Sequence, residues 1–237
     1  MKAMNSKKKI GLIGGVGPQA TKFIYEKIIE LAQSKYGAKN NDDYPHIIIE
    51  SLPIPDFISD KNQIEVAKKM LLESIQSLTK AGATRLCLGS NTVHILLDEL
   101  KKTTEIKFIS MIELVAKKCV ENGFSKVGLF GTPILLESGL YKKELEKNGI
   151  ELILPSKEEI EISDNVIRDV LAGRKILKKQ EYVKALNDVF KKGAEAIILG
   201  CTELPLTINY EALGSRIISS DEVLAEGIVD YYYSEEL

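Results

Sequence analysis

The chain has 237 residues, of which 44% are hydrophobic and 28% charged, and its formal net charge is −2 at pH 7. The near balance of 32 basic and 34 acidic residues gives no field that would attract nucleic acid or an anionic membrane. No apolar stretch approaches the ~20 residues of a membrane span, and the first apolar run is too short and glycine-rich for a signal peptide. Three cysteines and two histidines, without metal-ligand spacing, predict no disulfide framework and no metal site. We therefore expect a soluble protein of the reducing cytoplasm.

Short apolar runs and amphipathic segments of helical length alternate along the whole chain. The apolar runs lack polar alternation, which is typical of parallel strands that are covered on both faces. The predicted strands are residues 10–15, 46–52, 85–90 and 107–111 in the first half, and 126–132, 150–155, 196–202 and 216–220 in the second.

The segments between these runs place apolar residues at three- and four-residue spacing, and several end at glycine, which predicts helices. The clearest are residues 20–37, 62–82, 137–149 and 180–194, with a last helix at 221–233. Strands that alternate with helices predict βαβ units with right-handed crossovers and parallel sheets.

The sequence carries an internal duplication. GATRLCLGSNTVH at 82–94 recurs as GAEAIILGCTELP at 193–205, and the segment 8–28 matches 125–145 in the same order and at nearly the same offset. Two ordered matches predict an α/β fold of two pseudo-symmetric lobes, each a parallel sheet flanked by helices. We place the first lobe at 1–103 plus 215–237, because the last helix returns to it, and the second at 104–214.

The duplication puts a hydroxyl and a thiol at matching positions. Ser90 follows one predicted strand and Cys201 follows its counterpart, and ligands of parallel α/β sheets bind beyond the carboxyl ends of the strands. Helices predicted to begin behind these residues would offer N–H groups to a carboxylate. Two such ends facing each other across a cleft would suit proton exchange on both faces of one carbon.

Three segments carry a resemblance to a known family. GGVGPQAT at 14–21, SNTVH at 90–94 and GCTE at 200–203 resemble the GGxGPxAT, CNTxH and GCTE segments of the aspartate/glutamate racemases. The resemblance implies a cofactor-independent amino-acid racemase, often a homodimer, in which one thiolate removes the Cα proton and an opposing thiol returns one. It matches Cys201 to the second catalytic cysteine and Ser90 to the first.

Ser90 departs from this pattern at a single atom. A thiol can act as base or acid near neutrality, whereas an alcohol needs a partner base, and His94, one turn further on, is the nearest candidate. Three explanations stay open for Ser90: an introduced replacement that stops turnover, a natural divergence that leaves a one-sided or weak racemase, and a different reaction that needs one cysteine.

The remaining predicted site residues would bind substrate or shape its pocket. They are Val16, Asn91, Thr92, His94, Thr132, Thr202 and Glu203. A structural role stays open for several: His94 could cap or pack against its helix, and Glu203 could only charge a helix start. Cys87 and Cys119 fall within apolar segments and are predicted to be buried.

Two departures bear on the substrate. Relatives that act on aspartate tend to carry Arg after an Asp in the loop following the second strand, where this chain has Phe57, and some carry Lys where it has Leu171. Without these cations the substrate could be less acidic than aspartate, or could be bound by Arg168, Lys157 or Arg174.

Two alternative functions stay open. Gly15 begins a G-x-G-x-x-A pattern that also fits a dinucleotide-binding turn, although Glu50 lies later than the expected acidic residue. The chain could also be a ligand-binding protein, or a single-cysteine decarboxylase or isomerase, that keeps the cleft without racemising.

Overall fold

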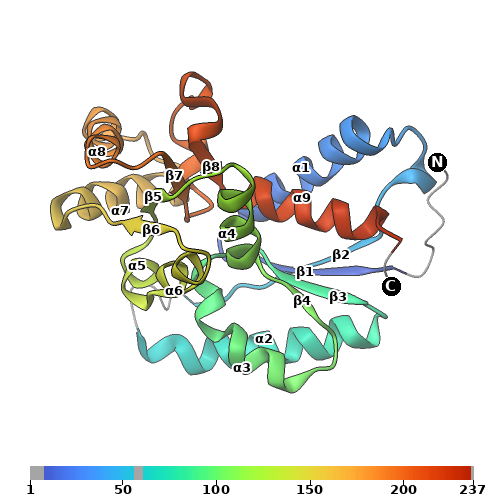
Figure 1. The fold of residues 1–237 in the computed structure, drawn as a ribbon. Coiled ribbons are helices and arrows are strands. Elements are labelled where there is room, and N and C mark those ends of the chain that lie inside the picture. The colour runs from blue at the N-terminus through green and yellow to red at the C-terminus, as the bar shows by residue number, and fades with distance from the viewer. Residues whose placement is uncertain (1–7, 56–60, 236–237) are drawn as a thin grey trace. The chain divides into compact units, whose positions relative to one another are not determined.

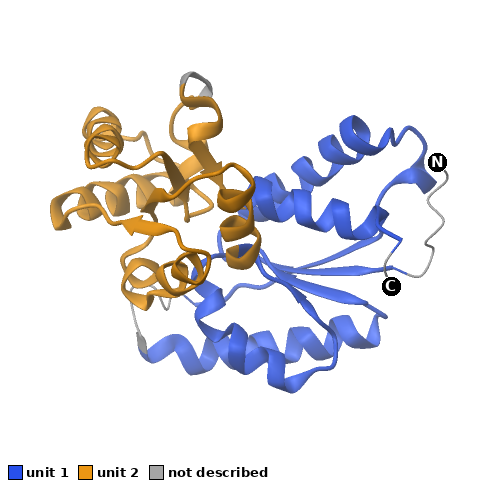
Figure 2. Cartoon of the chain, in the orientation of Figure 1, with its two compact units in different colours: residues 1–111, 221–237 blue, residues 112–220 orange. Residues whose placement is uncertain are grey.

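The computed structural model describes residues 8–55 and 61–235, and the chain divides into two compact units. Unit 1 comprises residues 1–111 and 221–237, and unit 2 comprises residues 112–220 (Figure 2). The last helix, α9 (Ser220–Tyr233), therefore returns to unit 1 as the sequence predicts.

Unit 1 contains a four-stranded parallel sheet in the order β2-β1-β3-β4 within the described residues. Its strands are β1 (Ile10–Gly14), β2 (Ile47–Ser51), β3 (Arg85–Leu88) and β4 (Phe108–Ile109). Its helices are α1 (Pro18–Tyr36), α2 (Ile64–Lys80) and α3 (Leu97–Leu100), and α1 and α9 lie on one face of the sheet with α2 and α3 on the other (Figure 1).

Unit 2 contains the equivalent sheet in the order β6-β5-β7-β8, again parallel in the described part of the chain. Its strands are β5 (Lys126–Phe130), β6 (Glu151–Ile153), β7 (Ala196–Leu199) and β8 (Ile217–Ser219). The helices are α4 (Met111–Glu121), α5 (Pro133–Ser138), α6 (Leu140–Lys147), α7 (Lys157–Leu171) and α8 (Lys179–Lys191). The predicted pair of α/β lobes, each with a parallel sheet flanked by helices, is confirmed.

The units divide later in the chain than the sequence places them. The expected divisions after residues 103 and 214 differ from the observed ones at 111/112 and 220/221. The strands between these positions account for the difference: β4 pairs with β3 of the first sheet, and β8 pairs with β7 of the second. A strand belongs to the unit whose sheet satisfies its backbone N–H and C=O groups.

One predicted helix is interrupted. Residues 137–149 form the end of α5 and then α6, separated by Gly139, which has a φ of 69°. A left-handed residue ends a right-handed helix, and glycine adopts that conformation without a Cβ clash.

Separate buried clusters stabilise the two units. In unit 1, Leu71, Ile75 and Leu78 of α2 pack with Leu86 and Leu88 of β3. In unit 2, helices α7 and α8 supply residues such as Val166, Tyr182 and Val189 to a cluster with Ile197 and Leu199 of β7. Helices buried against continuous apolar strands explain why these strands lack polar alternation. No helix in the described part of the chain combines the length and apolarity needed to cross a membrane.

Candidate functional site

Ser90 and Cys201 occupy equivalent positions in the two units. Each lies two residues beyond the carboxyl end of its strand, β3 or β7. The glycine before each donates to the neighbouring first strand of its sheet: Gly89 N lies 2.8 Å from Ile13 O, and Gly200 N lies 2.7 Å from Phe130 O. The duplication thus places the hydroxyl of Ser90 and the thiol of Cys201 on equivalent backbone turns, one in each unit.

The turn at Gly200 has no room for a side chain. A Cβ there would lie 2.8 Å from Leu129 Cδ1 and 3.1 Å from Phe130 O. Glycine therefore allows the chain to leave β7 close to β5 and to present Cys201 directly after the sheet. Cys201 is only 7% exposed and Ser90 8% exposed, so both are largely desolvated.

Neither residue is followed directly by an α-helix, and here the sequence prediction is wrong. Short 3-10 helices follow instead, at Thr92–Leu96 and Leu204–Leu206. Pro205 lacks a backbone N–H and restricts Leu204, while the β-branched Thr92 and Val93 are weak helix formers. The helix dipole expected at these positions is therefore small, because few peptide units are aligned in these short helices.

His94 contacts the backbone of Ser90 rather than its hydroxyl. Its Nδ1 lies 2.8 Å from the Ser90 carbonyl oxygen, and its Nε2 accepts from the Met111 N–H at 3.2 Å. These partners require a proton on Nδ1 and none on Nε2. Burial lowers the pKa of His94 to about 4, although the Ser90 carbonyl opposes this shift. His94 is thus neutral and fully engaged, and it fixes the turn that carries Ser90.

Cys201 contacts a buried carboxylate in its own loop. Its Sγ donates to Glu203 Oε2 at 3.0 Å, and Thr202 Oγ1 donates to the same oxygen at 3.0 Å. Burial raises the pKa of Glu203, opposed by these two hydrogen bonds. The other oxygen, Oε1, is buried and has no hydrogen-bond partner among the described residues. A carboxylate with a raised pKa and a free lone pair is equipped to accept a proton or a hydrogen bond.

The glycine-rich loop after β1 is held by α1. The Gly15 N–H donates to Thr21 Oγ1 at 2.9 Å, and Gly15 has a φ of 90°. A Cβ on Gly15 would lie 2.4 Å from the backbone N and O of Leu52. Val16 follows this turn, half-buried against the core of unit 1. Thr21 belongs to the GGVGPQAT segment, but its anchoring role was not predicted.

The other predicted substrate-binding residues are buried near these turns. Asn91 and Thr92 directly follow Ser90, and Thr132 follows β5, where its hydroxyl accepts from Leu135 N at 3.4 Å as the N-cap of α5. Unit 1 therefore holds Val16, Ser90, Asn91, Thr92 and His94, and unit 2 holds Thr132, Cys201, Thr202 and Glu203. That the two sets form a single site stays a prediction.

Cys87 and Cys119 are fully buried, and burial raises the pKa of both thiols. The predicted burial of these two cysteines is confirmed. No group of three or more His, Cys, Asp or Glu side chains with metal-binding geometry occurs among the residues that the structure describes.

Of the three cationic residues considered as substitutes for a missing substrate cation, Arg168 and Arg174 form ion pairs with acidic side chains, and Lys157 is the exposed first residue of α7. Arg168 Nε lies 2.7 Å from Asp164 and Arg174 Nε lies 3.1 Å from Asp169, both at exposed positions. Leu171 is the last residue of α7 and is 41% exposed, while Phe57 lies outside the described residues.

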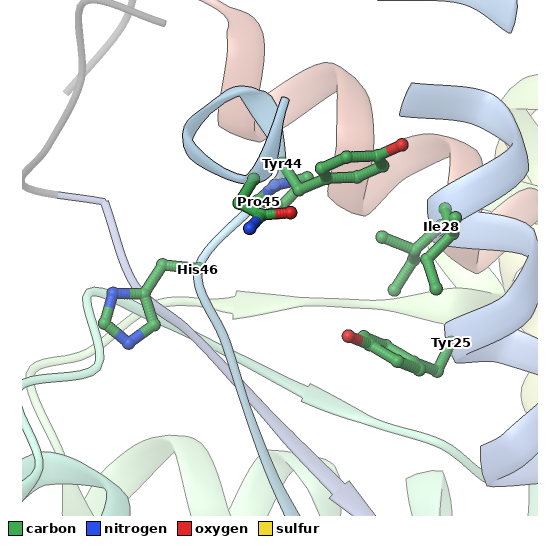
Figure 3. A pocket seen from close by; sticks show the side chains of 7 residues that line it. Tyr25, Ile28, Tyr44, Pro45 and His46 are labelled. Atoms are coloured by element: carbon green, nitrogen blue, oxygen red, sulfur yellow. The ribbon is translucent and has the colours of Figure 1, made fainter. Parts of the chain in front are cut away.

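A pocket of about 570 Å³ lies elsewhere in unit 1. Its lining consists of Tyr25, Ile28, Ile29, Asn41, Tyr44, Pro45 and His46. Figure 3 shows the Tyr25 and Tyr44 rings on either side of Ile28, with the His46 ring directed away from them. The pocket adjoins the start of β2, whereas the predicted site residues of unit 1 follow the ends of β1 and β3. It includes none of the predicted site residues.

The chain is similar to proteins of one known family over most of its length. The model of the Asp/Glu/hydantoin racemase family matches residues 13–226, a span that includes every predicted site residue. The chain belongs to this family. The broad specificity amino-acid racemase RacX of Bacillus subtilis (strain 168) is 27% identical over 223 residues, which cover 94% of this chain and 97% of RacX.

Solved structures of the family share the fold. An aspartate racemase homologue from Pyrococcus horikoshii OT3 is 30% identical, with a TM-score of 0.81 over 96% of this chain and 100% of that one. The aspartate racemase of Picrophilus torridus is 26% identical, with a TM-score of 0.82 over 95% of this chain and 94% of that one. The resemblance read from three short segments is thus confirmed over almost the whole chain.

Proposed function

We propose that this chain is an amino-acid racemase of the Asp/Glu/hydantoin racemase family that works without a cofactor and in which Cys201 is the principal acid/base. The single observation that supports the two-sided chemistry is the equivalence of Ser90 and Cys201 on matching turns of the duplicated sheets. The proposal requires both turns to reach one substrate, with Cys201 on one face of Cα and Ser90 on the other.

In the proposed reaction the Cys201 thiolate takes the Cα proton and leaves a carbanion stabilised by the substrate carboxylate. Return of a proton from Cys201 restores the same enantiomer, and protonation from the opposite face gives the other. Glu203 forms the thiolate by accepting the thiol proton, because its Oε2 lies 3.0 Å from Sγ and burial raises its pKa. Asn91, Thr92, Thr132 and Thr202 supply donors to the substrate carboxylate.

Ser90 makes the proposed reaction unequal on the two faces. The hydroxyl of Ser90 is a weak acid near pH 7 and needs a partner base before it can take part in proton transfer. His94 cannot serve as that base because both of its ring nitrogens contact the backbone. Cys201 then exchanges the Cα proton of one enantiomer readily, while inversion through Ser90 is slow. The geometry at His94 favours this one-sided racemase over a serine activated by histidine.

The proposed substrate is an amino acid less acidic than aspartate. Phe57 and Leu171 stand where aspartate-specific relatives carry cations, and Arg168 and Arg174 each pair with an acidic side chain of unit 2. A carboxylate side chain on the substrate would lack a charged partner at these positions. The name of RacX, a racemase of broad specificity, supports testing neutral amino acids first.

Two further expectations accompany the proposed activity. A homodimer is expected from the resemblance to the family, and a cytoplasmic location is expected from the three cysteines, none of which forms a disulfide in the structure. Sedimentation velocity of the purified chain measures the first, and fractionation of the source cells measures the second.

The deciding experiment follows deuterium at Cα. The chain is incubated in D₂O with a panel of L- and D-amino acids, and proton NMR and chiral chromatography measure exchange and inversion separately. We expect exchange of one enantiomer to exceed inversion, and we expect Ser90→Cys to raise inversion at least about tenfold.

The same experiment includes a control variant and has one outcome that contradicts the proposal. Cys201→Ala is expected to abolish exchange of both enantiomers, because it removes the only proposed strong base. Measurable amino-acid binding without exchange in the wild-type protein and in Ser90→Cys would replace the racemase proposal with a ligand-binding function.

A further inference from the structure

The hydroxyl groups of Thr207, Tyr210 and Tyr182 form a hydrogen-bond network next to the loop that carries Cys201. The network centres on the carbonyl oxygen of Leu204, the residue after Glu203. This oxygen lies 2.7 Å from Thr207 Oγ1, 3.0 Å from the Thr207 N–H nitrogen and 3.0 Å from the Tyr210 hydroxyl. Leu204 is fully buried, so these hydrogen bonds form where water cannot replace them.

The network continues into helix α8. The Tyr210 hydroxyl lies 2.9 Å from Thr207 Oγ1 and 3.2 Å from the hydroxyl of Tyr182. Tyr182 is fully buried, and its ring packs edge-on to Phe130 at 5.7 Å between centroids. Burial raises the pKa of both tyrosines, so their hydroxyls stay protonated near neutral pH and remain available as donors.

The loop between Gly200 and Leu204 is therefore held at both ends. Gly200 N donates to Phe130 O at 2.7 Å at its start, and the hydroxyl network holds the Leu204 carbonyl at its end. The Cys201–Glu203 contact of 3.0 Å lies between these two points. Because its two side chains are only two residues apart, the length of that contact depends directly on the loop backbone.

We propose that Tyr210 is a positioning residue that sets the contact between Cys201 and Glu203. Its hydroxyl fixes the Leu204 carbonyl, and this carbonyl fixes the backbone that follows Glu203. The inference rests on the proposed function in one respect, namely that the Cys201–Glu203 contact handles the catalytic proton. Tyr210 lies outside the three family-like segments, and its partners come from α8 and from the loop itself.

Tyr210→Phe tests this role because it removes the hydroxyl and keeps the ring. The primary readout is the rate of Cys201 alkylation by iodoacetamide as a function of pH, followed by mass spectrometry of the Cys201 peptide. We expect the profile to move to higher pH and the rate at pH 7 to fall several-fold, because a displaced Glu203 carboxylate no longer accepts the thiol proton and less of Cys201 is present as the reactive thiolate. In the exchange assay we expect kcat to fall about fivefold with little change in KM, as for loss of one hydrogen bond.

Tyr141→Phe is the matched control. Tyr141 is also a buried tyrosine of unit 2, in α6, where it is 1% exposed. Its hydroxyl is expected to affect stability without moving the Cys201 profile. If Tyr210→Phe does not fold, Thr207→Val removes another donor to the same carbonyl and is expected to shift the profile in the same direction.

A Cys201 profile in folded Tyr210→Phe or Thr207→Val that matches the Tyr141→Phe profile overturns the inference. Alkylation needs no turnover, so the two proposals fail separately. A shifted profile in a protein that exchanges no amino acid supports the positioning role of Tyr210 and rejects the racemase function.

Discussion

His94 and Ser90 are joined through the backbone, with Nδ1 of the imidazole 2.8 Å from the Ser90 carbonyl oxygen. The opposite nitrogen accepts from the N–H of Met111, the first residue of α4. A histidine one turn after a serine suggests a nucleophile and its base, but the imidazole of His94 is buried and neutral, and both of its nitrogens form hydrogen bonds with the backbone. Its two hydrogen bonds join the turn after β3, at Ser90, to the start of α4, at Met111.

The stability of the protein is expected to depend on pH through His94. Its pKa in the fold is about 4, below the ordinary value of 6.5, so the unfolded chain binds a proton more readily. The contribution is present above pH 6.5 and is lost as pH falls toward 4, by up to about 3 kcal/mol. Urea unfolding from pH 4 to pH 8 measures it, and His94→Gln should remove this slope while His46→Gln, at an exposed position, retains it.

Glu203→Gln is expected to raise stability and lower activity together. Burial raises the pKa of Glu203, so its charged form destabilises the fold as pH rises above the ordinary value of 4.5. The neutral amide avoids that cost at pH 7, by an amount on the order of 1 kcal/mol. Thermal unfolding and the exchange assay measure the two effects, and an unchanged exchange rate would remove Glu203 from the proposed mechanism.

The three cysteines are expected to differ in reactivity. Cys87 and Cys119 are fully buried, and burial raises the pKa of Cys119 to about 12 and that of Cys87 further. Cys201 keeps 7% exposure at the end of a strand. Brief treatment with iodoacetamide at pH 7.5 should therefore modify Cys201 first, as measured by peptide mass spectrometry. Equal modification of all three would indicate a general opening of the fold.

Gly15→Ala is expected to be much more destabilising than Gly37→Ala. Both glycines have a positive φ, 90° and 71°, but only Gly15 would place its Cβ against backbone, 2.4 Å from Leu52 N and O. Gly37 has nothing within 4 Å, so its substitution costs about 1 kcal/mol for the left-handed conformation alone. Gly15→Ala should cost at least about 3 kcal/mol, because the backbone must move. Paired urea titrations measure the difference. Equal decreases in the free energy of unfolding would show that the loop after β1 can move to accept a Cβ without cost.

Lys8 is expected to stabilise the return of the chain to unit 1. It is 1% exposed, and its Nζ donates to Tyr231 O at 2.8 Å and to Ser234 O at 2.7 Å, near the end of α9. Lys8→Ala leaves both carbonyls without this donor and should lower the unfolding free energy by about 3 kcal/mol. The neighbouring Lys9, whose Nζ makes one exposed contact with Ala81 O, is the control, and Lys9→Ala should cost less than about 1 kcal/mol.

The sequence by itself determined the alternation of strands and helices, the duplication, and the positions of Ser90 and Cys201. These features are local: continuous apolar runs predict buried parallel strands, glycines mark the turns, and two matched segments predict matched units. Family membership was likewise predicted from three short segments, because residue types at fixed spacing can be recognised along the chain without knowledge of the tertiary structure.

Only the tertiary structure decided what the side chains near those turns contact. The orientation of His94 depends on Met111, which comes from the start of another helix, and the network of Tyr210 depends on Tyr182 from α8. The buried environment of Glu203, which raises its pKa, is likewise a property of the packed unit. Such contacts join residues distant in sequence, and burial depends on the whole unit, so neither residue type nor spacing specifies them.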